Sequence, residues 1–163
     1  MADAVAACDA MIAACHAAKV RLAVVKTERY RKLTLRAKEL VDEGRIGPVW
    51  MLNTFSMFPV PVGKDLHQSR PWFSHPDGGG LFMVMASHNA DMLRWISGWN
   101  AVRVFAQVNT FSDLPEPALT VMAQIAFEGG IIAQMWISSE MPPPSMPSAE
   151  VRFQVVGGSG ILD

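Results

Sequence analysis

Hydrophobic residues recur with the period of an α-helix in three stretches of the chain. Residues 2–18 contain nine alanines, the strongest helix former, and predict a first helix. Residues 30–43 repeat apolar side chains every three or four positions, and Gly44 follows where a helix commonly ends. Residues 81–96 predict a third helix, whose apolar residues fall on one stripe when successive residues are turned by about 100°. The stripe comprises Leu81, Val84, Met85, His88, Met92, Trp95 and Ile96.

Other segments are rich in β-branched and aromatic residues and predict strands. One lies at residues 20–25, directly after the first helix, and a second at residues 49–58. Four more follow, at residues 102–111, 119–127, 131–137 and 151–156. Gly129 and Gly130 predict a hairpin between two of them, because a two-residue turn needs positive φ at both positions. This order of elements predicts an α+β fold, with an open, mostly antiparallel β-sheet and helices packed on one face.

The predicted strands carry apolar residues on both faces, so each face of the sheet needs a cover. In residues 119–127, Val121 and Ile125 point to one side while Met122 and Ala126 point to the other. Two helices can cover one face. A second copy of the sheet is the economical cover for the other face, which predicts a homo-oligomer. The alternative is a second face that is rich in methionine and partly exposed.

A long loop is predicted at residues 59–77, which contain four prolines, and loops of this length are often functional. Arg70 and Trp72 lie on this loop. They could bind a hydroxylated or carboxylated small substrate, Arg70 through forked hydrogen bonds and Trp72 by stacking. The alternative for Arg70 is a solvated surface side chain.

Composition and charge narrow the class of protein. The 163 residues are 50% apolar and 18% charged, which suits one folded domain, or one domain plus part of another. The net charge is −1 and the basic residues are dispersed, so nucleic acid is not an expected partner. Asp3 and Asp9 interrupt the short apolar start, which predicts a cytoplasmic protein without membrane contact. Cys8 and Cys15 are too far apart on one helix to form a disulfide.

Three motifs follow one another along the chain. Arg29-Tyr30 precedes a helix that ends in the turn Gly44-Arg45-Ile46-Gly47. Gly78-Gly79-Gly80 then opens a helix containing Ser87-His88-Asn89-Ala90-Asp91. The last motif is Val155-Val156-Gly157-Gly158-Ser159-Gly160-Ile161. Together the motifs resemble the C-terminal domain of the glucose-fructose oxidoreductase, inositol dehydrogenase and MocA (Gfo/Idh/MocA) family of NAD(P)-dependent oxidoreductases, and the resemblance covers nearly the whole chain.

The resemblance implies two parts. Residues 1–27 correspond to the last helix and strand of a nucleotide-binding Rossmann domain, and residues 28–163 to a substrate and oligomerisation sheet domain. The implied cofactor is NAD or NADP, and the implied substrate is a sugar, polyol or related cyclic alcohol. The family's glycine-rich fingerprint and catalytic lysine lie upstream of the positions that this chain covers. The cofactor site is therefore expected to be incomplete, with no cofactor-binding residue assigned here, and the chain to be inactive alone.

His88 is the catalytic candidate, because imidazole titrates near neutrality and could exchange a proton with a substrate hydroxyl. The alternative is a hydrogen-bonded core residue. The resembled family has an aspartate four residues before this histidine, where this chain has Val84. Asp91 could orient the imidazole or serve a structural role.

The sequence also bears on a metal centre and on a non-catalytic role. No metal site is predicted, because the four histidines are widely spread and no Cys-x-x-Cys or His-Glu-x-x-His pattern occurs. The alternative to an oxidoreductase domain is a non-catalytic module that self-associates or binds a partner through its open sheet.

Overall fold

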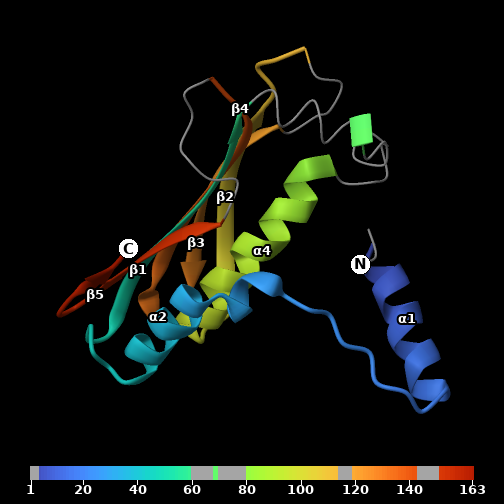
Figure 1. Ribbon diagram of the computed structural model, residues 1–163, viewed down its shortest axis with the longest axis horizontal. Coiled ribbons are helices and arrows are strands. Elements are labelled where there is room, and N and C mark those ends of the chain that lie inside the picture. The colour runs from blue at the N-terminus through green and yellow to red at the C-terminus, as the bar shows by residue number, and fades with distance from the viewer. Residues whose placement is uncertain (1–3, 60–67, 70–79, 114–118, 143–150) are drawn as a thin grey trace.

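The computed structural model describes residues 4–59, 68–69, 80–113, 119–142 and 151–163. These residues form one sheet with helices on one side, and an N-terminal helix that stands apart (Figure 1). The helical elements are α1 (Val5–Ala17), η1 (Thr27–Tyr30), α2 (Lys32–Asp42), α4 (Gly80–Ser97) and η3 (Glu128–Gly130). The strands are β1 (Val49–Pro59), β2 (Ala101–Asn109), β3 (Thr120–Phe127), β4 (Ile132–Met141), β5 (Arg152–Gly157) and β6 (Ile161–Leu162).

The six strands form an open sheet in the order β2-β3-β4-β1-β5-β6. Neighbouring strands are antiparallel except β1 and β4, which run parallel with Phe55 opposite Trp136. The predicted α+β fold with an open, mostly antiparallel sheet is confirmed. The parallel pair was not predicted, because α4 and two strands separate β1 from β4 along the chain.

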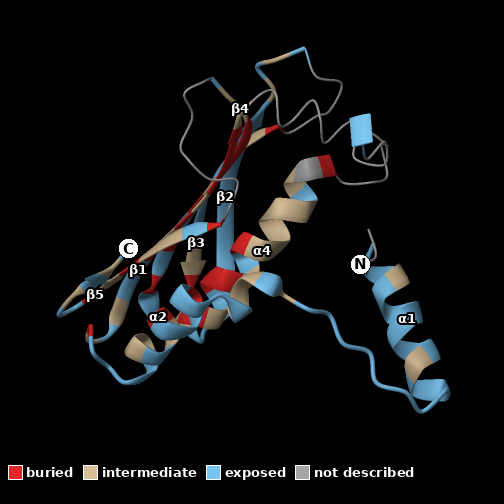
Figure 2. Cartoon of the chain, in the orientation of Figure 1, coloured by how far each residue is buried: buried red, intermediate tan, exposed pale blue. Residues whose placement is uncertain are grey.

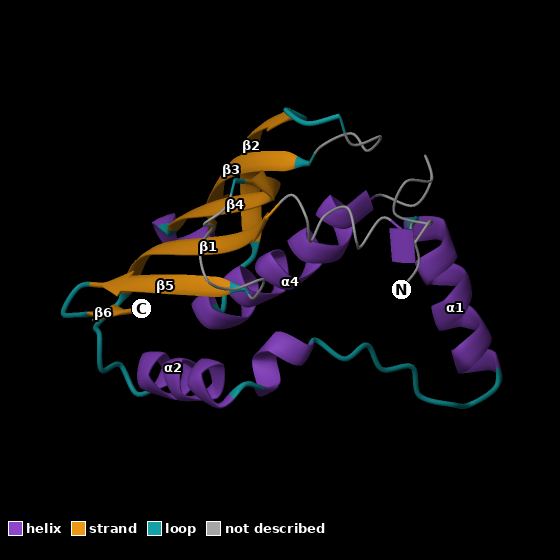
Figure 3. Cartoon of the chain, turned by 45° about the horizontal axis from the view of Figure 1, so that its top comes forward, coloured by secondary structure: helices purple, strands orange, loops and turns teal. Residues whose placement is uncertain are grey.

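Burial alternates along the central strands, so the sheet has one packed face and one open face. In β3, Val121 and Ile125 are 2% and 7% exposed, whereas Met122 is 54% exposed. α4 crosses β1 and β4 on the packed side, and α2 lies on the same side below β5 (Figure 3). The buried residues gather where these helices meet the sheet (Figure 2). Helices on one face of the sheet were predicted, and this prediction is confirmed.

The buried side of α4 differs from the predicted apolar stripe. Asn89, Met92, Leu93 and Ile96 are at most 2% exposed and follow the i, i+3, i+4, i+7 spacing of one helix face. His88, which the predicted stripe placed at its centre, is only half-buried on the flank of this face. The prediction is wrong in this detail because Asn89 finds a hydrogen-bond partner in the sheet, which hydrophobic periodicity does not register.

The N-terminal arm, residues 4–25, makes little contact with the sheet. α1 forms as predicted and stands apart from the sheet (Figure 1), and none of its residues is buried (Figure 2). Residues 20–26 pair with no strand in the described part of the chain, so the strand predicted at residues 20–25 is wrong for this structure. A β-strand needs a neighbouring strand for its backbone hydrogen bonds, which β-propensity alone cannot supply. No helix in the described ranges is both long and apolar enough to cross a membrane.

The predicted hairpin between β3 and β4 is confirmed. Gly129 and Gly130 have φ values of 73° and 81°, in the left-handed region that favours glycine. The Phe127 N–H donates to the Ile131 carbonyl at 2.9 Å, and this bond closes the turn.

At the end of β3 and β4 away from this hairpin, the Glu140 carboxylate accepts three hydrogen bonds. Glu140 Oε1 accepts hydrogen bonds from the backbone N–H groups of Phe111 at 2.8 Å and Ser112 at 2.6 Å. Its Oε2 accepts a third from the Thr120 hydroxyl at 2.8 Å. Burial raises the pKa of Glu140, but the hydrogen bonds to the carboxylate outweigh burial and hold the pKa below its usual value.

Glu140→Gln is expected to lower the free energy of unfolding by about 1 kcal/mol near pH 7, because these bonds lose their charged acceptor. The carboxylate contributes fully above its ordinary pKa of 4.5, and this contribution is lost as the pH falls through the lower pKa of the folded state. The difference in the free energy of unfolding between wild type and variant, measured by urea denaturation, should therefore disappear in acid. A gap that persists at about pH 3 contradicts this account. Glu39→Gln, on the exposed surface of α2, is the control and should change stability less.

Candidate functional site

His88 lies midway along α4 and is half-buried. Its Nδ1 is shielded from solvent and has no hydrogen-bond partner among the residues that the structure describes. A functional histidine commonly has one nitrogen held by a carboxylate or carbonyl, which fixes the ring while the other nitrogen acts. Within the described ranges, no carboxylate or carbonyl binds His88 Nδ1 in this way.

The position one helical turn before His88 explains the missing partner. Val84 occupies it, and residues four apart on a helix lie on the same side. An aliphatic side chain cannot accept a hydrogen bond. The Ser87 hydroxyl is already engaged, since it donates to the Val84 carbonyl at 2.8 Å.

A buried polar pair next to His88 was missed by the sequence analysis. Asn89 and Ser56 are both 0% exposed, and the Ser56 hydroxyl donates to Asn89 Oδ1 at 2.9 Å. Asn89 Nδ2 has no partner within the described ranges. The available signal was an asparagine at core spacing in an otherwise apolar helix. The bond ties α4 to β1 one residue away from His88 and sets the rotation of the helix.

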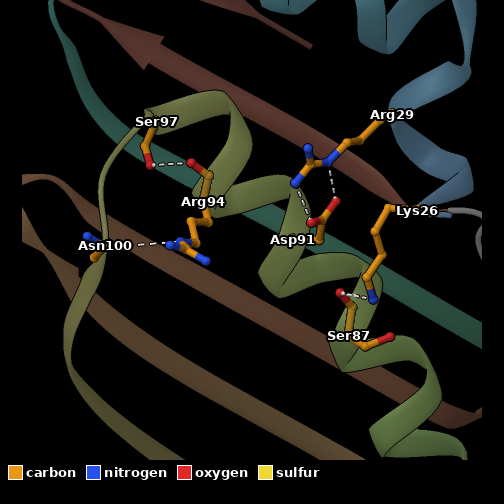
Figure 4. Close-up of polar contacts among 7 residues, drawn as sticks. All are labelled: Lys26, Arg29, Ser87, Asp91, Arg94, Ser97 and Asn100. Carbon is orange, nitrogen blue, oxygen red and sulfur yellow. Dashed lines mark hydrogen bonds and ion pairs between the residues drawn. The ribbon is translucent and has the colours of Figure 1, made fainter. Parts of the chain in front are cut away.

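Asp91 binds the segment before α2 rather than the His88 ring. Arg29 donates hydrogen bonds to both carboxylate oxygens of Asp91, from Nε to Oδ2 at 2.7 Å and from Nη2 to Oδ1 at 2.6 Å (Figure 4). The guanidinium carbon also lies 5.4 Å from the centroid of the Trp95 ring. The hydrogen bonds to Asp91 raise the pKa of Arg29 above its ordinary value. These contacts favour the structural role for Asp91 over the hypothesis that it orients the imidazole.

The predicted substrate contacts lie outside the described residues. Arg70 and Trp72 belong to residues 70–79, as do Gly78 and Gly79. Gly80 is described, begins α4, and has a φ of 63°. The structure therefore places His88, whereas Arg70 and Trp72 stay outside the residues that it describes.

The open face of the sheet carries a row of amide side chains that no sequence pattern had indicated. This amide row consists of Gln124, Gln134, Asn53 and Gln154, which are cross-strand neighbours on β3, β4, β1 and β5. Asn53 Nδ2 donates to Gln154 Oε1 at 3.1 Å. An aromatic row on one side of it comprises Met122, Trp136 and Phe55, and an aliphatic row on the other comprises Ala126, Ile132, Met51 and Val156.

A hollow of about 590 Å³ lies over the amide and aliphatic rows. Arg103 and Phe105 of the edge strand β2 contribute to its lining. Phe105 is 64% exposed and Ile132 is 56% exposed. Apolar surface of this extent on an ordered sheet is typical of an interaction site.

The described residues do not fit a dinucleotide. Pyrophosphate binding in this fold class needs a strand, a glycine-rich turn and a helix N-terminus in succession. The N-cap of α1, Ala4, makes no side-chain hydrogen bond, and the glycines at residues 157–160 lead into β6 rather than a helix. Within the described ranges, no group of three or more His, Cys, Asp or Glu side chains could hold a metal ion.

Comparison with known proteins identifies the class of protein. The model of the GFO/IDH/MocA C-terminal domain matches residues 34–163. The chain therefore belongs to the Gfo/Idh/MocA family of oxidoreductases, which confirms the resemblance found in the sequence motifs.

The matching relatives align with most of this chain and are themselves longer. It is 31% identical over 119 residues to the uncharacterized oxidoreductase YrbE of Bacillus subtilis strain 168, a match spanning 70% of this chain and 32% of YrbE. The WlbA dehydrogenase of Bordetella pertussis, crystallised with NADH and UDP-GlcNAcA, is 26% identical, with a TM-score of 0.79 over 94% of this chain and 46% of that one. The aldose-aldose oxidoreductase of Caulobacter crescentus, crystallised with glycerol, is 26% identical, with a TM-score of 0.82 over 99% of this chain and 46% of that one. The chain thus spans about a third to a half of these relatives.

Proposed function

We propose that this chain is the substrate and oligomerisation domain of an NAD(P)-dependent oxidoreductase acting on a sugar, polyol or related cyclic alcohol. Residues 1–27 belong to the nucleotide-binding domain, and residues 28–163 form the wall that holds the substrate. The observation that carries the proposal is His88, a half-buried imidazole on the helix that covers the sheet, whose Nδ1 has no partner among the described residues. The ligands crystallised with the WlbA dehydrogenase and the aldose-aldose oxidoreductase support this substrate class.

In this proposal His88 accepts the hydroxyl proton when the substrate alcohol is oxidised and returns it in the reverse direction. Arg70 would bind substrate oxygens through forked hydrogen bonds, and Trp72 would stack on its ring. NAD or NADP would supply the hydride acceptor when bound, and the described residues do not provide a site that fits it. Val84 cannot supply the orienting carboxylate from one helical turn before His88, so proton transfer is expected to be slow.

Val84→Asp is expected to supply the missing acceptor, because a carboxylate one turn before His88 can reach Nδ1. Nitrogen NMR should show Nδ1 changing to the resonance of a hydrogen-bonded N–H group. In a chain completed with a nucleotide-binding domain, turnover should rise about tenfold or more. Val84→Asn, which has the shape of aspartate without its charge, is the control and should have a smaller effect. An unchanged resonance contradicts the placement of Val84 beside His88, and a changed resonance with unchanged turnover contradicts the catalytic role.

The proposal includes a homo-oligomer formed through the open face. An amide group both donates and accepts hydrogen bonds, so the amide row of one copy can bind that of a second copy related by a two-fold axis. The second copy would also cover the aromatic row, in which the ring centroids of Phe55 and Trp136 lie 6.4 Å apart in an edge-to-face arrangement.

The second candidate is a non-catalytic self-association module, which the exposed open face and Val84 both favour. Titration with glycerol or inositol, followed by NMR, separates the two candidates. A substrate domain should show shifts concentrated around His88, whereas a self-association module should show none there. Fluorescence titration with NADPH tests the incomplete cofactor site, since tight binding by this chain contradicts it.

A further inference from the structure

We infer that Ser56 and Asn89 are positioning residues for His88, because the hydrogen bond between them fixes the direction in which α4 presents the imidazole. This role rests on the proposed function only in assigning proton transfer to His88. The direction of the ring in the folded chain can be measured without cofactor or substrate. The contacts that determine it lie inside the fold, between α4 and β1.

The buried face of α4 is held to the sheet in two ways. Met92, Leu93 and Ile96 belong to the apolar core, and apolar contacts have no preferred direction. Asn89 adds a directional contact, since the Ser56 hydroxyl donates to Asn89 Oδ1 at 2.9 Å and both residues are 0% exposed. This bond therefore determines how far α4 is turned about its own axis.

A second polar contact restricts the rotation of α4 less. Asp91 lies about 200° around the helix from Asn89 and accepts two hydrogen bonds from Arg29 (Figure 4). The arginine side chain has several rotatable bonds and can follow a small turn of the helix. The Ser56 hydroxyl cannot follow, because it is one carbon away from the backbone of β1, which is paired with β4 and β5.

A turn of α4 moves the imidazole, because His88 directly precedes Asn89 in the same helix. Side chains reach about 5 to 6 Å from the axis of an α-helix, so a turn of about 20° carries a ring by about 2 Å. A displacement of about 1 Å at a reacting group can lower a rate about a hundredfold. Val84 provides no acceptor one helical turn earlier, so the direction of the ring depends all the more on the rotation of the helix.

Three variants separate a positioning role from a role in stability alone. Ser56→Ala removes the donor and leaves the Asn89 amide buried, so the midpoint of urea denaturation should fall by about 1 M. Ser56→Ala combined with Asn89→Leu replaces both polar groups by apolar ones and should regain most of this loss. Thr54→Val is the matched control, because it removes a buried hydroxyl of the same strand that is bonded to the Gln134 carbonyl rather than to α4.

NMR of the chain as it stands gives the deciding readouts. Residual dipolar couplings report the rotation of α4 relative to the sheet, and the ring resonances report the surroundings of His88. Both should differ from the wild type in Ser56→Ala and in the double variant, although the double variant is stable, and both should be unchanged in Thr54→Val. A folded double variant with wild-type couplings and ring resonances overturns the inference, since the pair then contributes stability alone.

Turnover of a chain completed with a nucleotide-binding domain separates this outcome from the proposed function. In the double variant kcat should fall about tenfold or more while KM changes little, because the displaced ring affects the chemical step rather than substrate binding. A displaced ring with unchanged kcat contradicts proton transfer by His88, and with it the proposed function, while it still confirms that Ser56 and Asn89 position the ring.

Discussion

Replacing Gly157 by alanine is expected to lower the free energy of unfolding by about 3 kcal/mol or more. A Cβ at this position would lie 2.2 Å from the Ile46 carbonyl oxygen and 3.0 Å from its carbonyl carbon. These are backbone atoms that cannot swing aside as a side chain can. The same carbonyl accepts a hydrogen bond from the Ser159 N–H at 2.8 Å, so separating the two turns to make room also loses this bond.

A matched variant in the same turn isolates the clash. At Gly160 the nearest atom to a new Cβ is Ile46 Cγ2 at 3.2 Å, the end of a side chain that can shift. Gly160→Ala should therefore cost about 1 kcal/mol or less. Urea denaturation of both variants gives the comparison. Stability of Gly157→Ala equal to that of the wild type contradicts the packing of these two turns.

This contact also shows what the sequence could not predict. The glycines at residues 44–47 and 157–160 were each interpreted as a turn, and each is one, because turn formation depends on local backbone chemistry. Nothing local indicates that turns more than a hundred residues apart pack against each other. The helices α2 and α4 and strands β1 to β5 were predicted on the same local basis. The failure at residues 20–25 follows from the same limit, since a strand is defined by its neighbour.

Some features of the candidate site could likewise be predicted from the sequence, and others could not. His88 and the absent carboxylate at Val84 were found from a motif, because both lie on one helix at fixed spacing. The pairs Ser56 with Asn89 and Arg29 with Asp91 join residues far apart in sequence, so they required the folded structure. Asn89 was overlooked because an amide in an apolar stripe lowers the hydrophobic signal, although burial of the amide is stabilised by its hydrogen bond.

Ile132→Arg is expected to weaken self-association about a hundredfold or more, if copies of the chain meet through the open face as proposed. Ile132 is 56% exposed in the aliphatic row and lines the hollow beside Gln134. In a face-to-face dimer its arginine replacement would be buried without a counter-charge, and apolar contact area would be lost. Sedimentation over a range of concentrations measures the change in dissociation constant. The thermal midpoint at low concentration shows whether the single chain stays folded.

Val104→Arg is the matched control, because it makes a similar change at a similar exposure on the other face. Val104 is 63% exposed on the edge strand β2, opposite Ile125, which is buried on the packed side. A second copy seated on the open face leaves Val104 free, so this variant should associate as the wild type does. Dissociation by Val104→Arg alone would instead place the contact on the packed side of β2, the edge strand of the described sheet. A wild type that stays monomeric at high concentration contradicts both arrangements, because either one leaves exposed apolar residues to drive association.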